Sequence, residues 1–252
     1  MKIRIIDGLS IKRKIRGIAA VLSAFVLITL VFSVVSASLK ENEEIEKVNA
    51  EEVSQIIIID PGHGGVDVGA IGVDGVYEKD LNLQIAFTLG EMLRERGFTV
   101  IYTRTTDRML YREEENIKGM RKLYDLKNRC KVAEGYESAI FVSIHMNSFG
   151  ASKYSGLQVY YSNNDKSSQA LAGKIQSAVK EKLQPENNRQ IKNGKDIYIL
   201  DNCETLSVLI ECGFLSNPEE CEKLSKKEYQ KELCFSIVCG IIDYNEARFD
   251  EN

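Results

Sequence analysis

Two histidines, His63 and His145, supply the only imidazole side chains among 252 residues. His63 lies in the glycine-rich stretch "DPGHGG" directly after the apolar run "IIII", and His145 ends the apolar run "AIFVSIH". Glu78 follows the same glycine-rich loop, and Glu211 lies inside the apolar run "SVLIEC". Two histidines and a carboxylate suit Zn²⁺, because catalytic zinc commonly takes three protein ligands and keeps one position for water. Zinc lowers the pKa of that water to about 7, so these residue types indicate metal-assisted hydrolysis.

Each of these residues also has an ordinary structural explanation. A single histidine in a loop is usually a surface residue, and a glutamate just before a helix usually complements the helix dipole. Glu211 is harder to explain in this way, because a carboxylate inside an apolar strand is costly unless it is paired or functional. Histidines and glutamates so far apart match no compact metal motif, so spacing alone leaves both explanations open. The glycine-rich loop lacks the Lys-Ser/Thr of a phosphate-binding loop, which ranks a phosphate site below a metal site.

The elements that must position these residues alternate between strand and helix. Apolar runs predict strands at 56–60, 98–103, 139–145, 156–162, 196–200 and 207–212. Helical patterns cover 80–96, about 112–135, about 167–183 and a stretch from near residue 227. This alternation predicts a single α/β domain, with a mostly parallel sheet of about six strands and helices on both faces. Ligands of such sheets gather at the carboxyl ends of the strands, where His63, His145 and Glu211 would meet. Glu78, between the loop and a helix, can turn toward the same edge.

The amino-terminal part of the chain has a different character. Residues 17–39 contain no charged side chain, and six basic residues against one acid precede them. A run of this length predicts a transmembrane or signal helix, with the basic flank in the cytoplasm and the rest of the chain exported. Cleavage near Ala37 is the alternative, although the apolar run is longer than a signal peptide usually has. The predicted organisation is an anchor at 1–39, an acidic tether at 40–54 and a catalytic domain at 55–248.

Composition excludes some functions and leaves others open. A net charge of −4 and a pI near 5.5 argue against a general nucleic-acid binder. The six cysteines form no C-x-x-C pair, which gives a zinc finger little support. Outside the membrane they could form disulfides, and they could equally be buried thiols.

Three segments resemble those of a known family. "IIIIDPGHGGVDVGAIGVDGVYEKDLNLQIA", "FVSIHMNS" and "VLIECGFLSNPEE" are similar, in this order, to the signature segments of zinc-dependent N-acetylmuramoyl-L-alanine amidases. The resemblance covers about residues 56–246 and implies an α/β sheet of about six strands. It also implies that His63, Glu78 and His145 are ligands of Zn²⁺ and that Glu211 is the catalytic carboxylate. Asn147, in "HMNS", falls where the family has a substrate-binding asparagine beside the site.

Within the family, the chain is most similar to the germination-specific type that processes spore-cortex peptidoglycan. That type has an amino-terminal anchor and no appended wall-binding repeat. The resemblance implies cleavage of the amide bond between N-acetylmuramic acid and L-alanine, which leads to muramic-δ-lactam in the cortex. One departure is Leu206–Ser207, where these enzymes tend to have Pro-Gly or Pro-Ala; it puts the fit of the substrate in question more than the chemistry. The alternatives are an inactive wall-binding scaffold and a zinc peptidase acting within the stem peptide.

The glycine-rich segment before Glu78 also bears on partners. Ordering a flexible ligand loop costs about 1–2 kcal/mol for each residue fixed, which should weaken metal binding. We therefore expect loose zinc binding and an exported activator protein that stabilises the zinc-loaded state. The other expected partners are peptidoglycan as substrate and the membrane, through the amino-terminal helix. No nucleic acid is expected.

Overall fold

The computed structural model describes residues 29, 32–33, 35–36 and 54–250. The predicted anchor at 1–39 and tether at 40–54 fall almost wholly outside these residues. Among the helices that are described, none combines the length and the apolar character needed to cross a bilayer. Residues from 54 onward form one compact unit, which is described by itself below.

A six-stranded sheet lies at the centre of this unit. In the order β2-β1-β3-β6-β4-β5, its strands are β1 (Ile56–Pro61), β2 (Thr99–Tyr102), β3 (Ile140–Asn147), β4 (Gln158–Tyr161), β5 (Lys192–Asn193) and β6 (Leu206–Phe214). Strands β1, β2, β3 and β6 are parallel, and β4 runs antiparallel to β6. The continuous apolar runs of β1 and β3 fit this arrangement, because strands covered on both faces need apolar residues on both. The predicted mostly parallel α/β sheet is confirmed.

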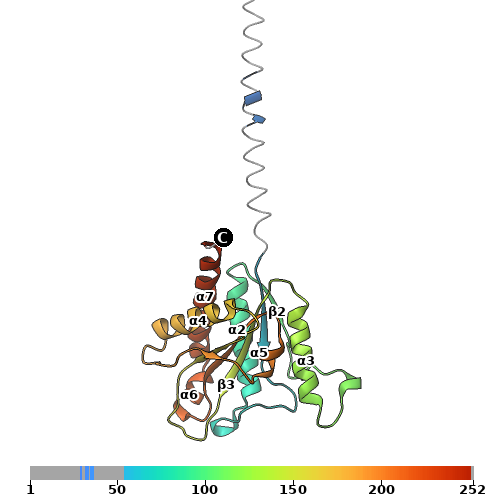
Figure 1. Cartoon of the computed structure of the whole chain (residues 1–252). Helices are drawn as coiled ribbons and strands as arrows, with labels where there is room; N and C mark the ends of the chain where they lie inside the picture. Colours follow the sequence, from blue (N-terminus) through green and yellow to red (C-terminus); the bar gives the residue numbers. More distant parts are fainter. Residues whose placement is uncertain (1–28, 30–31, 34, 37–53, 251–252) are drawn as a thin grey trace, which may run out of the picture. The chain divides into compact units, whose positions relative to one another are not determined.

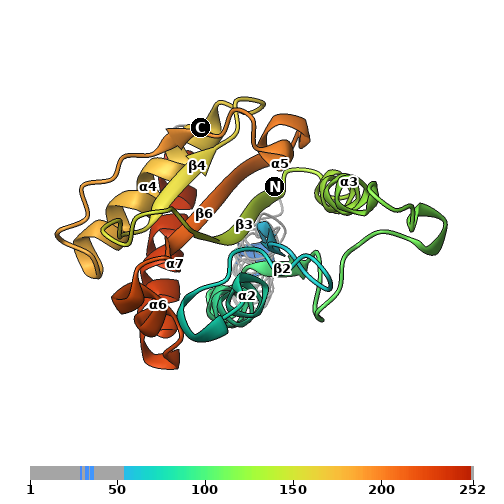
Figure 2. The same ribbon diagram turned by 90° about the horizontal axis from the view of Figure 1, so that it is seen from below.

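Helices cover both faces of the sheet (Figures 1 and 2). They are α2 (Glu78–Arg94), α3 (Arg121–Glu134), α4 (Ser167–Lys182), α5 (Tyr198–Asn202), α6 (Pro218–Leu224) and α7 (Lys227–Asp250), with 3-10 turns at Val73–Gly75 and Glu113–Glu115. Helices α2, α4 and α7 pack together on one face, whereas α3 and α5 contact each other on the opposite face. The carboxyl edge of β1, β3 and β6 is thus framed by elements from both layers.

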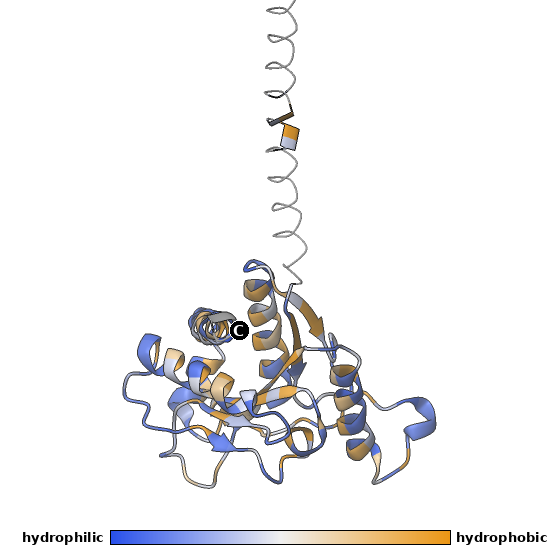
Figure 3. Cartoon of the chain, turned by 45° about the horizontal axis from the view of Figure 1, so that its top comes forward, coloured by the Kyte–Doolittle hydropathy of each residue, from blue (hydrophilic) through white to orange (hydrophobic). Residues whose placement is uncertain are grey.

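Two separate apolar clusters hold the layers together. The larger one joins β-strand residues such as Ile57, Ile144 and Ile210 to helices α2, α4 and α7, and the smaller one joins Ile58 and Phe141 to α3 and α5. Figure 3 shows the corresponding colours, with apolar residues on the strands and polar residues on the outer sides of the helices. Neighbouring residues in one strand enter different clusters because successive side chains point to opposite faces.

One predicted strand is wrong. Residues 196–200 do not form a strand, because the chain is helical from Tyr198 onward, and the sixth strand is the two-residue β5. Asp196 adopts a left-handed backbone conformation with φ of 72°, which breaks the extended run before Ile197. Ile199 and Leu200 are consecutive and both buried. This is possible because they lie in the short helix α5, which contacts both α3 and β6.

Helix boundaries also differ from the expected ones. Helix α2 begins at Glu78 rather than Asp80, so that Glu78 lies in its first turn. The stretch predicted as one helix at 112–135 is divided into a 3-10 turn and α3. Five of the six cysteines are buried and Cys239 is partly buried; Cys130, Cys203, Cys212, Cys234 and Cys239 are free thiols.

Candidate metal centre

Three of the residues singled out from the sequence converge at the carboxyl edge of the sheet. His63 follows β1, Glu78 begins α2 and His145 lies in β3, and one donor atom from each lies within 4.8 Å of the others. Oε1 of Glu78 lies 3.2 Å from Nε2 of His63 and 2.9 Å from Nδ1 of His145. The two imidazole rings meet edge to face, with centroids 4.9 Å apart. Two nitrogens and one oxygen thus face a common point.

Glu78 is fixed by its place at the start of helix α2. The backbone amide of Met146 donates to Oε1 over 3.0 Å, and that of Ala70 donates to Oε2 over 2.7 Å. Burial alone would raise the pKa of Glu78, but hydrogen bonds from the two histidines outweigh it and the pKa is lowered. The positive end of the helix dipole also favours a carboxylate in the first turn. Glu78 is therefore a charged, oriented oxygen donor.

Two buried arginines hold the loop that carries His63. Arg104 donates to the carbonyl oxygens of Pro61 and Gly62 over 2.9 and 3.0 Å. Arg129 donates to the carbonyl oxygens of Pro61 and His63 over 2.8 and 2.6 Å. His63 has a left-handed backbone, with φ of 62°, which is uncommon for a residue other than glycine. The arginines hold the backbone of this loop in place and so fix the backbone position from which the His63 side chain extends.

Asp60 and Arg129 form a buried ion pair beneath that loop. Nη1 of Arg129 lies 2.6 Å from Oδ1 of Asp60, and Thr103 and Ser143 donate to the same carboxylate over 2.6 and 2.7 Å. Burial would raise the pKa of Asp60, but the charge of Arg129 and these hydrogen bonds lower it. Sequence reasoning missed both arginines. The signal for them was the aspartate that ends the run "IIIID", since a carboxylate in a covered strand needs a buried partner.

Asp67 is a second residue that sequence reasoning missed. Its Oδ2 lies 3.0 Å from Nδ1 of His63, on the side of the ring away from Glu78. Burial works against protonation of His63, but the hydrogen bonds to Asp67 and Glu78 raise its pKa to about 9. Histidines that bind metals commonly donate their second ring nitrogen to a carboxylate, which fixes the tautomer and the ring. Asp67 is placed to orient His63 in this way.

Glu211 lies beside the three donors. It is the register partner of His145 in the β3–β6 pair, so both side chains point to the same face of the sheet. The side chain is partly exposed, yet its Oε2 is buried and has no hydrogen-bond partner among the described residues. Burial raises the pKa of Glu211 to about 7, with a smaller contribution from the charge of Glu78. Such a carboxylate can exchange a proton near neutral pH.

Asn147 does not join this cluster. It ends β3 opposite Phe214 and lines a neighbouring hollow together with Gln158 and Arg189. A substrate that reached from the metal donors along the sheet edge toward β4 would pass it.

The donor set and its surroundings fit a metal ion. Imidazole nitrogens and one carboxylate match zinc, whereas calcium and magnesium prefer all-oxygen sites. The backbone is also shaped around the donors: a Cβ at Gly62 would lie 2.1 Å from Nε2 of His145, and one at Gly69 would lie 2.5 Å from Oε2 of Glu78. Only glycine at these two positions leaves the donors where they are.

Replacing Gly62 with alanine is expected to lower zinc affinity by about 10–100-fold, the range found when the support of a metal ligand is lost. The added methyl group would overlap the His145 ring and displace its donor nitrogen. Competition with a chromogenic chelator measures the affinity. Gly150→Ala is the matched control, because a Cβ there meets no atom within 4 Å. Unchanged affinity in Gly62→Ala would contradict this account of the site.

Comparison with known proteins gives a consistent result. Residues 57–243 match the family model described as N-acetylmuramoyl-L-alanine amidase. The germination-specific N-acetylmuramoyl-L-alanine amidase of Bacillus subtilis (strain 168) is 37% identical over 196 residues, covering 78% of this chain and 82% of that protein.

Solved structures agree with the sequence matches. The CwlD amidase from Clostridioides difficile, in complex with the GerS lipoprotein, superimposes with a TM-score of 0.73 and 41% identity over 77% of this chain and all of that one. An N-acetylmuramoyl-L-alanine amidase from Clostridium difficile 630 gives a TM-score of 0.67 and 31% identity, over 77% of this chain and 98% of that one. The donors at one sheet edge, the matched segment and these relatives lead to one conclusion: the chain belongs to the N-acetylmuramoyl-L-alanine amidase family.

Proposed function

We propose that the chain is a zinc-dependent amidase that cleaves the bond between the lactyl group of N-acetylmuramic acid and L-alanine in peptidoglycan. The observation that carries this proposal is the meeting of His63, Glu78 and His145 within 4.8 Å, with Glu211 as the register partner of His145. The first three would hold Zn²⁺, and Glu211 would be the catalytic carboxylate. The family match supports the reaction.

The residues divide the chemistry between them. Zinc, when bound, supplies a Lewis acid that polarises the amide carbonyl and lowers the pKa of a water molecule. Glu211 would accept the proton of the attacking water and pass it to the departing amine of L-alanine. Glu211 is the register partner of His145, and its Oε2 has no hydrogen-bond partner among the described residues, so this carboxylate is placed to take a proton and release it. Asp67 would keep the donor nitrogen of His63 directed at the metal, and Asn147 would contact the substrate.

Digestion of purified peptidoglycan tests this function. The full-length protein is expected to release intact stem peptides with L-alanine at their amino end, leaving glycan without peptide. A chelator should abolish the release, and added zinc should restore it where magnesium does not, because of the nitrogen donors. Mass spectrometry identifies the products. Shortened stem peptides would show instead a peptidase acting within the stem, and a protein that never holds zinc or cleaves wall would be a scaffold.

The cortex role is a finer proposal. We infer that the enzyme clears muramic acid residues that a deacetylase can then convert to muramic-δ-lactam, which the spore needs for germination. The similarity to the germination-specific relative supports it. The measurement that checks this role is the muramic-δ-lactam content of cortex from a deletion strain. A normal lactam content would refute the cortex role and leave the proposal of a general peptidoglycan amidase.

The proposed location of the protein in the cell rests on its sequence alone. We propose that residues 1–39 anchor the chain in the cell membrane, with the catalytic domain at 55–248 outside it, or that cleavage near Ala37 releases it. The uncharged stretch 17–39 with its basic flank supports this. The amino-terminal sequence of the mature protein distinguishes the two.

An exported activator protein is the last part of the proposal. The relative from Clostridioides difficile was solved in complex with a lipoprotein, which supports a partner of this kind. The argument from a flexible ligand loop has less force, because Glu78 lies on helix α2. A partner that binds only the zinc-loaded form must raise the protein's affinity for zinc. Zinc must raise the protein's affinity for the partner by the same factor. Zinc titration with and without the candidate partner measures that factor.

A further inference from the structure

A hollow of about 340 Å³ lies next to Glu211 on the β4 side of the sheet. Gln158, which lines it, is the register partner of Glu211 in the antiparallel β4–β6 pair, and Tyr160 lies two residues further along the same face. The pKa of Tyr160 is raised by burial and also by the charge of Glu211. We call this hollow, lined in part by Gln158, Tyr160, Arg189 and Lys192, the β4 hollow. It continues the proposed catalytic edge away from the histidines.

The charge of the β4 hollow is of one sign. Its lining contains two cations, Arg189 and Lys192, and no acidic side chain. The remaining lining residues are aromatic or carry amides. The amide of Asn147 and the rings supply contacts for a neutral part of a ligand, whereas the two cations favour an anion.

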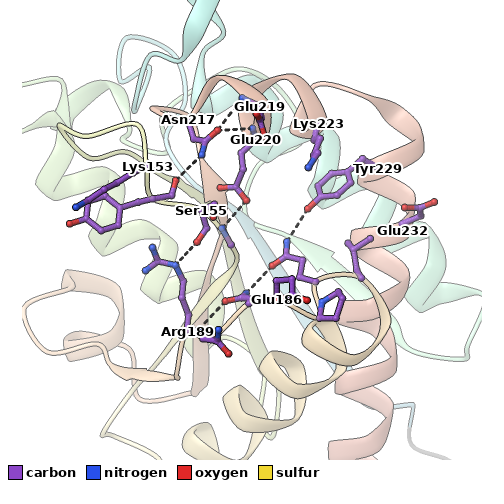
Figure 4. A pocket seen from close by; sticks show the side chains of 17 residues that line it. Lys153, Ser155, Glu186, Arg189, Asn217, Glu219, Glu220, Lys223, Tyr229 and Glu232 are labelled. Atoms are coloured by element: carbon purple, nitrogen blue, oxygen red, sulfur yellow. Dashed lines mark hydrogen bonds between the residues drawn. The ribbon is translucent and has the colours of Figure 1, made fainter.

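Arg189 is held in place from several sides. Its Nε donates to the carbonyl oxygen of Ser155 over 2.7 Å, as Figure 4 shows, and its Nη1 donates to Oε1 of Gln158 over 3.3 Å. The guanidinium lies 4.4 Å from the centre of the Phe214 ring. Gln158 is itself buried and donates to the carbonyl oxygen of Gln190 over 2.7 Å. The cation is therefore oriented before any ligand arrives.

The guanidinium still has a free edge. Nη2 of Arg189 has no hydrogen-bond partner among the described residues, and no described carboxylate forms an ion pair with it. Arg189 also lines a larger cavity, of about 730 Å³, that contains Glu220 (Figure 4). Glu220 already accepts the backbone amides of Gly156 and Phe214 over 2.8 and 2.7 Å. The charge of Arg189 acts on Glu220, but no described carboxylate forms an ion pair with the guanidinium, so Arg189 can still bind an anion in the β4 hollow.

The substrate decides which anion could reach this position. In the glycan around the scissile bond, the lactyl carboxyl group is already tied up in the amide, so the sugar side is neutral. The stem peptide carries free carboxylates. Guanidinium groups bind carboxylates with charge-assisted, often paired hydrogen bonds, and a lysine does not reproduce that planar geometry.

We propose that Arg189 binds a free carboxylate of the stem peptide and makes the enzyme prefer acidic peptides over their amidated forms. This inference rests on the proposed amidase function. Arg189 would be a binding residue and would take no part in the proton transfers. Because hydrogen bonds to charged groups contribute about 1.5–3 kcal/mol, its loss should lower kcat/KM on an acidic substrate by about 10–100-fold. The change should lie mainly in KM, as expected when binding common to ground and transition states is removed.

The test compares two glycan-linked peptides that differ at one group. One carries a free α-carboxylate on the second peptide residue, and the other carries the amide there. We expect the wild-type protein to prefer the acid. We also expect Arg189→Gln to lose about 10–100-fold on the acid and little on the amide. Lys195→Gln, which removes an exposed charge from the same connecting segment, is the matched control and should change neither.

Each other outcome has a definite meaning. An equal loss on both substrates would overturn the proposal and show that Arg189 only supports Phe214 and its own segment, and no loss on either would overturn it as well. Arg189→Lys retains the charge without the planar fork, and should lie between the wild type and Arg189→Gln on the acid alone. If Arg189→Gln proves unstable in thermal unfolding, Arg189→Lys takes its place in the comparison of the two substrates. A wild-type protein that cleaves neither substrate at the muramoyl bond would refute the proposed function, and this inference with it.

Discussion

Replacing Glu211 with glutamine is expected to lower the rate of peptidoglycan cleavage by about 10²–10⁴-fold, the usual contribution of a general acid–base group. The amide has nearly the shape of the carboxylate, but it cannot accept the proton of the attacking water. The three metal donors are left in place, because none of them forms a hydrogen bond with Glu211. Zinc content should therefore remain that of the wild type.

The measurement is the initial rate of stem-peptide release, together with zinc content determined by mass spectrometry. Glu219→Gln is the matched control, since Glu219 is an exposed acid at the start of helix α6. Substantial activity in Glu211→Gln would exclude Glu211 as the group that carries the proton. A loss of zinc in parallel with activity would show that its role lies in holding the metal.

Replacing Arg129 with methionine is expected to destabilise the fold by about 3–5 kcal/mol, the cost of breaking a buried ion pair by removing one partner. Asp60 would be left buried without its counter-charge, since Arg129 and Asp60 are 1% and 0% exposed. The carbonyl oxygen of His63 would also lose its donor, so zinc affinity should fall with stability. Urea unfolding and chelator competition measure the two effects.

The pH dependence supplies a check on the same pair. The pKa of Asp60 is lowered in the folded protein, so the pair stabilises the fold above the ordinary pKa of about 4. That stability is lost as the pH falls below this value toward the lowered pKa. The difference between wild type and Arg129→Met should therefore narrow in acid. Lys226→Met is the control, because its partner Glu222 lies on the surface and exposed pairs contribute little. Equal stability of Arg129→Met and Lys226→Met at neutral pH would refute the assignment.

The sequence predicted the general architecture because its apolar runs directly reflect burial. The run "IIII" is continuous because β1 is covered on both faces, and this also places His63 just past a strand end. The observed strand pairing confirms the mostly parallel sheet, and the match to the family model confirms the family. The strand predicted at 196–200 was wrong because alternating apolar residues also occur in a short buried helix. The left-handed turn at Asp196, which decides between the two, leaves no mark on hydrophobic periodicity.

The candidate site was predicted in part for a similar reason. His63, His145 and Glu211 stood out because polar residues are unusual at the ends of apolar strands. Arg104 and Arg129 did not, because each is one arginine in a chain with 33 basic residues. Their roles come from pairing over more than 40 positions in the sequence, which no local pattern records. The roles of the metal donors and Glu211 stay predictions until the variants above are measured.

The long separation between the parts of the site has a consequence for the timing of activity. Arg129 lies 66 positions after His63, whose carbonyl oxygen it holds, and Glu211 comes later still, on the strand that pairs with β3. A chain synthesised from its amino end has the glycine-rich loop early, but until α3 has docked it lacks Arg129, one of the two arginines that hold the loop. Glu211, the proposed proton-transfer group, arrives only when β6 joins the sheet. An unfinished or truncated chain therefore has no working centre, and a wall-cutting activity appears only when folding is complete.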